Sequence, residues 1–236
     1  MRKFLFLMIF TVFGFAQSIS VIGGVHNING NFQYKGTQNS IKDIGIEQIY
    51  NFGIKANIDD DSFIPGILAD ISYFTSFSKN TTLNKNIIID NTPYNVNEKI
   101  TSKLSYTNIN LIAYYTFFKT PISYLRLGAG FLGNIGSLKI DGNQKYSHIN
   151  FKFYYPTLYT QFMLHTKHFL FGFGGSGTGL FSSDTLGKAE IFTGYKLKSV
   201  SFKIGYKYTK MKIDNYDGWY SDITTSGVYF EISKSF

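Results

Sequence analysis

The sequence predicts an all-β protein: an antiparallel transmembrane β-barrel of about ten strands, with eight or twelve strands as alternatives. Three observations predict this fold. Apolar and polar residues alternate with a period of two, short and long connections follow one another, and the chain ends on an aromatic residue, Phe236. A period of two is typical of strands, and outer-membrane barrels combine short periplasmic turns with longer extracellular loops.

The first 16 residues predict a signal peptide. Arg2 and Lys3 form a basic start, and a short apolar stretch with small residues at the expected cleavage positions follows. The stretch is too short to span a membrane as a helix, and no later apolar run is long enough. We therefore expect residues 17–236 to form one exported domain, an outer-membrane β-barrel located in the cell outer membrane.

Composition narrows the function classes. The 236 residues carry a formal net charge of +8, which falls to near +6 without Arg2 and Lys3, and they include no cysteine. The absence of cysteine excludes a disulfide framework and a zinc–thiolate site. The lysines are spread along the chain rather than clustered, and the chain is predicted to be exported. The positive net charge therefore does not indicate binding to nucleic acid. We expect no cofactor and no metal site.

The strands follow from the alternating segments. Their approximate bounds are 18–28, 46–58, 63–77, 101–118, 122–139, 148–165, 168–181, 186–197, 199–213 and 223–236. Tight connections alternate with longer ones, and the tight ones fall at the same end as both chain termini. We expect that end to face the periplasm. A soluble lipocalin-like barrel is the competing fold, but it needs an apolar interior and no alternation of loop lengths.

The segment 199–213 shows which face points where. Val200, Phe202, Ile204, Tyr206 and Tyr208 alternate with small or charged residues. In a membrane barrel the apolar face contacts lipid and the polar face lines the interior. The lysines at 203 and 207 are therefore predicted to face the lumen.

A lumen polar cluster is predicted from the strand register. The tight turn at 198–199 places Glu190 opposite Lys207, and Glu231 is expected beside Gly205, diagonal to Lys203 and Lys207. An interior of mixed charge suits a small barrel that is largely filled by side chains. The predicted cluster consists of Arg126, Lys152, Lys188, Glu190, Lys203, Lys207 and Glu231.

Two local features carry further predictions. The apolar residues of segment 148–165 change parity near Pro156, which predicts a β-bulge there. Aromatic residues near the turn end predict a girdle at the periplasmic membrane interface. The girdle residues are Tyr115, Phe117, Phe169, Tyr195 and Phe236.

Four stretches, "GNFQYKG", "SYTNINLIAYYTFF", "FYYPTLY" and "GVYFEISKSF", resemble an uncharacterised family of short Gram-negative outer-membrane β-barrel proteins. The family pattern has an acidic residue near the position of Asn110 in the second stretch, where this chain differs. The resemblance covers most of the mature chain. It implies the barrel fold and the outer membrane, and it brings no activity or catalytic residue.

The function expected is non-enzymatic: a structural, surface-binding or narrow, porin-like small-solute role. The alternative is a lipid-modifying enzyme of the acyl hydrolase type, with His148 at the extracellular rim near Ser183, Asp184 and Thr185. Two other features have ordinary interpretations. "DDDS" at 59–62 is read as an Asp-rich turn rather than a calcium site. Trp219 is read as an interface aromatic or, less commonly, a surface-binding tip.

The expected partners follow from the compartment. They are outer-membrane lipid and lipopolysaccharide around the barrel, and the barrel assembly machinery through the C-terminal segment that ends at Phe236. We expect no nucleic acid and a monomeric state.

Overall fold

The computed structural model describes residues 15–60, 63–76, 79–178, 184–216 and 218–236. Residues 1–14 of the predicted signal peptide lie outside the described residues. In the described part of the chain, no helix is long and apolar enough to cross a membrane.

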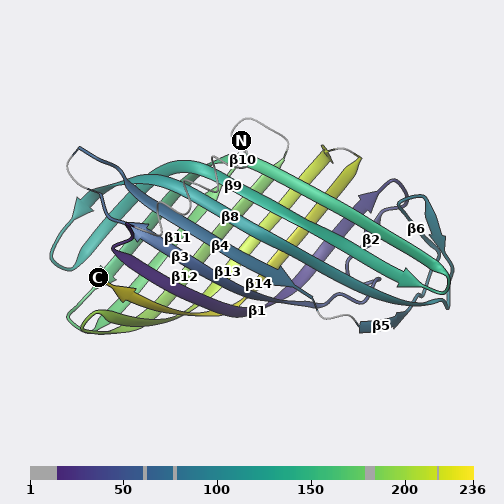
Figure 1. The fold of residues 1–236 in the computed structure, drawn as a ribbon, viewed down its shortest axis with the longest axis horizontal. Helices are drawn as coiled ribbons and strands as arrows, with labels where there is room; N and C mark the ends of the chain where they lie inside the picture. The colour runs from purple at the N-terminus through teal and green to yellow at the C-terminus, as the bar shows by residue number, and fades with distance from the viewer. Residues whose placement is uncertain (1–14, 61–62, 77–78, 179–183, 217) are drawn as a thin grey trace.

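Within the described residues, ten long strands form a closed antiparallel barrel (Figure 1), so the predicted fold is confirmed. The strands are β1 (Ser18–Tyr34), β3 (Gln48–Ile58), β4 (Gly66–Thr75), β8 (Lys99–Lys119), β9 (Ser123–Gly142), β10 (Lys145–His165), β11 (Phe169–Gly177), β12 (Thr185–Leu197), β13 (Val200–Tyr216) and β14 (Trp219–Ser235). Each pairs with the next along the chain. The barrel closes because β14 pairs with β1 over the full length of both strands, from Ser18–Ser235 to Tyr34–Trp219.

The two ends of the barrel differ. One end, called here the turn end, holds the first residue of β1 and the last residue of β14 together with the short connections after β8, β10 and β12. The opposite end, the loop end, holds the long segments 35–47 and 76–98. Two connections at the loop end, predicted to be longer, are short because the flanking strands extend farther. β9 ends at Gly142 and β10 begins at Lys145, and β13 ends at Tyr216 and β14 begins at Trp219.

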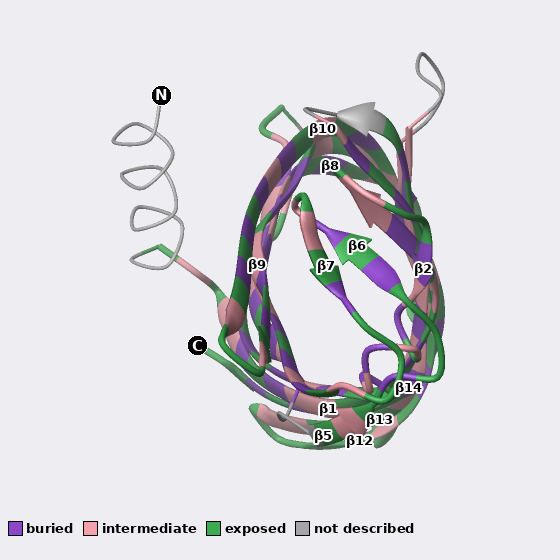
Figure 2. Cartoon of the chain, turned by 90° about the vertical axis from the view of Figure 1, so that its right-hand side faces the viewer, coloured by how far each residue is buried: buried purple, intermediate pink, exposed green. Residues whose placement is uncertain are grey.

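Four short strands belong to the long segments at the loop end. They are β2 (Asn39–Ser40), β5 (Lys79–Thr82), β6 (Ile87–Ile89) and β7 (Thr92–Tyr94). β2 pairs with β1, β5 pairs with β8, and β6 and β7 form a hairpin of their own. Figure 2 shows this hairpin lying across the opening of the barrel. We call the described residues of these two segments, 35–47 and 79–98, the cap.

The hydrophobic face changes sides along the strands. Near the turn end, β14 exposes Val228, Phe230 and Ile232 on its outer face. Near the loop end the same strand buries Trp219 and Ile223 on its inner face. The barrel therefore has a turn-end section that is apolar outside and polar inside, and a loop-end section with the opposite arrangement.

The same change explains β10, where the predicted bulge near Pro156 is wrong. The register between β9 and β10 runs without a shift from Gly142–Lys145 to Ser123–Leu164. Phe151 and Phe153 are buried inside the barrel. The parity of the apolar residues changes because the strand passes from one section to the other, and the backbone stays regular.

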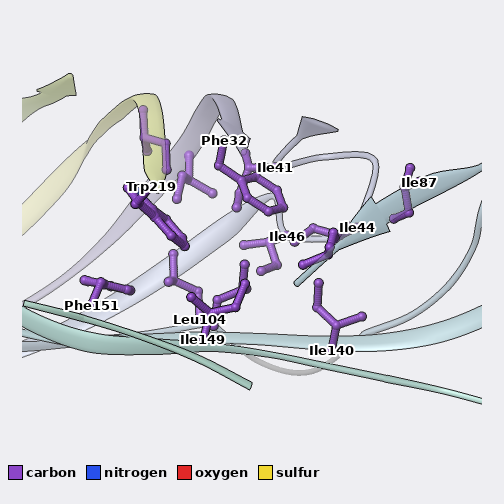
Figure 3. Close-up of a cluster of buried hydrophobic side chains, with 14 of the residues drawn as sticks. Phe32, Ile41, Ile44, Ile46, Ile87, Leu104, Ile140, Ile149, Phe151 and Trp219 are labelled. Carbon is purple, nitrogen blue, oxygen red and sulfur yellow. The ribbon is translucent and has the colours of Figure 1, made fainter. Parts of the chain in front are cut away.

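The interior of the loop-end section is an apolar core. Figure 3 shows cap residues, among them Ile41, Ile44 and Ile46, gathered with strand residues such as Leu104 and Ile149. All five are buried to 5% exposure or less. Full burial of one such side chain stabilises the fold by about 1.5–3 kcal/mol relative to exposure. The cap is therefore held in the barrel opening mainly by apolar contacts.

Trp219 belongs to this core, so both interpretations of it from the sequence are wrong. It is 4% exposed, and its ring centroid lies 6.1 Å from that of Phe32 in a stacked arrangement. The strand β14 begins at Trp219 itself, and its parity directs the side chain inward. A tryptophan that was expected at the surface is thus packed inside the apolar core of the loop-end section.

A hydrogen-bond relay fixes the β6–β7 hairpin to the barrel wall. The Tyr94 hydroxyl donates to Ser147 Oγ at 2.8 Å, and Ser147 Oγ donates to the Ile89 carbonyl at 3.2 Å. Tyr94 and Ile89 are fully buried, and Ser147 lies on β10. The polar groups of the hairpin are satisfied where it meets the wall, as burial requires.

Candidate functional site

The turn-end section encloses a cavity of about 680 Å³, which we call the vestibule. Its lining runs from the turn-end residues Ser18, Lys196 and Ser235 to Lys188 and Lys207 in the middle of the barrel. A second cavity of about 40 Å³ lies beyond these two lysines, and its lining combines residues of the apolar core with polar ones such as Asn108 and Asn134. Lys188 and Lys207 contribute to both linings, so they stand between the vestibule and the core.

Glu231 is the centre of the charged residues in the vestibule. Its carboxylate accepts hydrogen bonds from Lys55 Nζ at 2.8 Å, Lys203 Nζ at 2.7 Å and Ser233 Oγ at 2.9 Å. The carboxylate side chain is only 2% exposed. Lys203 stands directly opposite Glu231 in the register of β13 and β14. One carboxylate therefore holds two ammonium groups.

Two looser pairs lie deeper. Lys207 Nζ is 3.9 Å from Glu190, its register partner on β12, and lies over the ring of Tyr229. Lys188 Nζ is 4.0 Å from Asp70 and also donates to Asn108 Oδ1. At these separations the ion pairs have no direct hydrogen bond, so they neutralise the lysines less completely than Glu231 does.

Arg126 occupies the wall nearer the turn end. Its guanidinium lies 4.5 Å from the ring centroids of both Tyr114 and Tyr124, and it pairs with Asp59 at 2.7 Å. Asp59 comes from the turn that follows β3. The turn thus places a carboxylate where it can hold an arginine that lines the vestibule.

The neighbouring Asp60 fastens the same turn to β8. Its carboxylate accepts hydrogen bonds from the backbone N–H of Thr116 at 2.9 Å and from Thr116 Oγ1 at 2.6 Å. Partial burial opposes ionisation, but the bonds from Thr116 hold the pKa of Asp60 below its usual range. Among the described residues no three acidic, histidine or cysteine side chains gather as a metal site. The rest of "DDDS", residues 61–62, lies outside the described residues.

Of the seven residues predicted for the lumen cluster, six line the interior of the barrel and Lys152 does not. Lys152 lies between the buried Phe151 and Phe153, so it points outward, and its Nζ lies 4.8 Å from the Tyr154 ring centroid. It was placed inside because the parity of β10 was taken from the apolar residues alone. The six interior residues are Arg126, Lys188, Glu190, Lys203, Lys207 and Glu231.

The register predictions had different outcomes. Glu190 stands opposite Lys207, as predicted from the tight turn at 198–199. Glu231 stands opposite Lys203 rather than beside Gly205, so that prediction is wrong. The register of β13 and β14 shifts between Ile213 and Tyr216, close to the short connection between the two strands. The sequence analysis expected a longer loop between these strands, so it could not predict their register.

Lys55, Asp70 and Asn110 are among the vestibule residues that the sequence reasoning missed. Lys55 was recognisable, because "NFGIKAN" alternates polar residues with Phe52, Ile54 and an alanine. Asp70 and Asn110 are opposite each other in the register of β4 and β8. That pairing depends on the long cap segment between the strands, which gives no local signal for register.

Two members of the predicted group, His148 and Asp184, lie apart in the structure. His148 is exposed, and its ring lies 6.0 Å from that of Tyr146 on the same strand. Asp184 accepts hydrogen bonds from the Tyr155 hydroxyl and from the backbone N–H of Asp214. Seven steps along the extended strand lead from His148 to Tyr155, which is roughly 23 Å. Of the other two residues of that group, Ser183 lies outside the described residues and Thr185 is the first residue of β12.

No protein-family model and no curated protein sequence matches the chain, but solved structures do. The outer membrane protease OmpT from Escherichia coli is 11% identical, with 94% of this chain and 97% of that chain covered and a TM-score of 0.58. The transport unit of the autotransporter AIDA-I from Escherichia coli is 10% identical, with coverage of 93% and 91% and a TM-score of 0.50. The fold is that of an outer-membrane β-barrel. At these identities the likeness extends to the outer-membrane β-barrel fold alone.

Proposed function

We propose that this chain is an exported, non-enzymatic protein of the Gram-negative outer membrane that seals its own lumen and displays a folded cap at the cell surface. In this proposal the turn-end section spans the membrane with its vestibule open to the periplasm. The loop-end section stands outside the membrane. The role is structural or surface-binding rather than that of an open pore.

The observation that carries the proposal is the change of hydrophobic face between the two sections. On β13, the outer face exposes Phe202, Ile204 and Tyr206, and farther along it carries Lys210 and Lys212. A soluble protein rarely exposes a continuous apolar surface of this extent, whereas lipid accepts it. Where the outer face becomes polar, the strand leaves the lipid, and the interior becomes apolar as in a water-soluble barrel.

The filled interior supports a sealed barrel. The cap and the inner faces of the strands form one apolar core, and the space found between that core and the vestibule is about 40 Å³. A pore needs a continuous polar path, and an apolar constriction stays free of water and ions. The narrow-pore role expected from the sequence is therefore the less supported one.

The placement of the candidate catalytic residues supports a non-enzymatic role. An acyl hydrolase needs a base within hydrogen-bond reach of its nucleophile and of an orienting acid. His148 has Tyr146 as its ring neighbour, while Asp184 is engaged by Tyr155 and the Asp214 backbone.

The proposed partners follow from the membrane setting. The outer face of the turn-end section would contact outer-membrane lipid, and its loop-side rim would contact lipopolysaccharide. The exposed girdle residues Phe169, Tyr195 and Phe236 near the turn end support an interface at that level. The C-terminal segment would engage the barrel assembly machinery. In the turn-end section each strand pairs with a neighbour on both sides, so no strand edge is open there, which supports a monomer.

Cysteine labelling tests the orientation, and the chain has no native cysteine to interfere. We expect Asn143→Cys, in the loop-end turn after β9, to react with a membrane-impermeant maleimide in intact cells. Lys167→Cys, in the turn after β10, should react only after the outer membrane is permeabilised. Both positions are exposed, so a difference reports location rather than burial. Labelling of Lys167→Cys in intact cells, or recovery of both variants in the soluble periplasm, would contradict the proposal.

A further inference from the structure

We infer that the vestibule is a binding site for a small hydroxylated organic anion, such as a sugar phosphate or sugar acid, that enters from the turn end. The inference rests on the proposed function only for the compartment from which the ligand arrives. The site itself is argued from the charges, the hydrogen-bonding atoms and the size of the cavity.

The first argument is an excess of positive charge. The lining contains seven cationic side chains and four anionic ones, so it carries a net side-chain charge of +3. At its inner end four lysines face three carboxylates, because Lys55 and Lys203 share Glu231. The cationic side chains of the lining are Lys55, Arg126, Lys167, Lys188, Lys196, Lys203 and Lys207, and the anionic ones are Asp59, Asp70, Glu190 and Glu231.

The part of this excess at the inner end lies where water is restricted, whereas Lys167 and Lys196 are exposed. The side chains of Lys55, Lys188, Lys203 and Lys207 are all 17% exposed or less. Charges held away from bulk water need a counter-charge, because desolvation is not otherwise compensated. An anion bound among these lysines would supply it. The requirement is for negative charge, so the ligand class is an acid or a phosphate.

The second argument is a pair of polar atoms without partners among the described residues. Asn110 is 6% exposed, lines the vestibule, and its Oδ1 accepts no hydrogen bond; Arg126 Nε, also buried, donates none. A buried polar atom without a partner costs free energy, so a ligand that reaches either atom after a small side-chain shift gains by completing it. Asn110 Oδ1 calls for a donor and Arg126 Nε for an acceptor. A hydroxylated anion supplies both.

The third argument is size and wall chemistry. A cavity of about 680 Å³ lies within the ordinary range of small-molecule sites, roughly 300–1,000 Å³. Its wall includes the rings of Tyr124 and Tyr159, whose faces suit the C–H surface of a sugar ring. Inorganic phosphate alone would satisfy the charge but would leave the ring faces and Asn110 unused. The geometry therefore favours an acidic sugar over a bare anion.

The test is isothermal titration calorimetry on the purified full chain in detergent at low salt, with glucose 6-phosphate, gluconate, inorganic phosphate and glucose as probes. We expect glucose 6-phosphate and gluconate to bind, phosphate to bind about tenfold more weakly, and glucose not to bind at concentrations up to about 10 mM. High salt should weaken binding of the charged probes.

Matched variants locate the site. Lys55→Met should weaken binding of glucose 6-phosphate by about tenfold or more, and because Lys203 still neutralises Glu231 the variant should fold. Lys212→Met is the control: its side chain is exposed on the outer face of β13 in the loop-end section, and its binding should not change. Asn110→Leu should weaken glucose 6-phosphate while leaving inorganic phosphate unchanged.

Three outcomes would overturn the inference. Glucose could bind as tightly as glucose 6-phosphate, or Lys55→Met and Lys212→Met could change the affinity for glucose 6-phosphate to the same extent. The third outcome is that none of the anions binds at concentrations up to about 10 mM. Calorimetry in detergent is independent of membrane orientation and of conductance. A failure here therefore leaves the proposed function standing, and a failure of the labelling experiment leaves the calorimetric result standing.

Discussion

Replacing Glu231 with Gln is expected to lower the free energy of unfolding by about 3 kcal/mol. The side chain is 2% exposed and neutralises both Lys55 and Lys203 through hydrogen bonds of 2.7–2.8 Å. Removing one partner of a buried ion pair costs about 3–5 kcal/mol, because the remaining charge is left uncompensated. The lysines keep some access to vestibule water, which places the expected loss at the lower end. Urea unfolding in lipid vesicles measures it.

Glu190→Gln is the control for this prediction. Its carboxylate is 3.9 Å from Lys207, without a direct hydrogen bond, and is 20% exposed, so its loss should cost less, about 1–2 kcal/mol. A comparable loss in both variants would show that Glu231 has no special position in the charged cluster. A double-mutant cycle between Glu231 and Lys203 should give a larger coupling energy than one between Glu190 and Lys207.

Replacing Ile89 with Asp is expected to release the cap from the barrel opening. Ile89 is fully buried in the apolar core, and its burial is worth about 1.5–3 kcal/mol before the added cost of a buried carboxylate. Since 1.4 kcal/mol is a factor of ten, the open form of the cap should become at least about 100-fold more populated. Trypsin added to intact cells should then cleave after Lys85 in the variant and spare the wild type.

Ile88→Asp is the matched control, because Ile88 is the adjacent residue on the same strand and is 40% exposed. Its carboxylate would meet water, so the rate of cleavage after Lys85 should stay near that of the wild type. If the two variants were cleaved at similar rates, the packing of the cap would not depend on its buried face. The barrel itself should remain folded in both, since β6 and β7 pair only with each other.

Strand number and the strand bounds at the turn end could be predicted because alternation is a local property. At the loop end the bounds were predicted less well, since β1 reaches Tyr34 rather than residue 28 and β14 begins at Trp219 rather than residue 223. The segment 186–197 corresponds to Thr185–Leu197, and 199–213 begins within one residue of Val200–Tyr216. The error at Pro156 arose because a hydrophobic pattern reports which medium surrounds each face, and the medium changes along β10. The competing prediction, a soluble barrel with an apolar interior and a polar exterior, was rejected for the whole chain. The loop-end section nevertheless has this arrangement.

Positions within the site could be predicted where a tight turn fixed the register. Glu190 and Lys207 are separated by the turn at 198–199, so counting back from it pairs them. Glu231, Asp70 and Asn110 depend on connections that are irregular or long, so counting fails. The closure of the vestibule depends on Trp219 and on cap residues such as Ile44 and Ile89, which meet the strands only in the folded structure.

Single-channel recording in planar lipid bilayers tests the central claim, a barrel that is sealed at its loop end, most directly. The full wild-type chain, inserted and folded, should produce no steady conductance at moderate voltage, because the apolar core excludes a continuous path of water and ions. Stable, ohmic current steps that appear with insertion of the wild-type protein would contradict a sealed barrel.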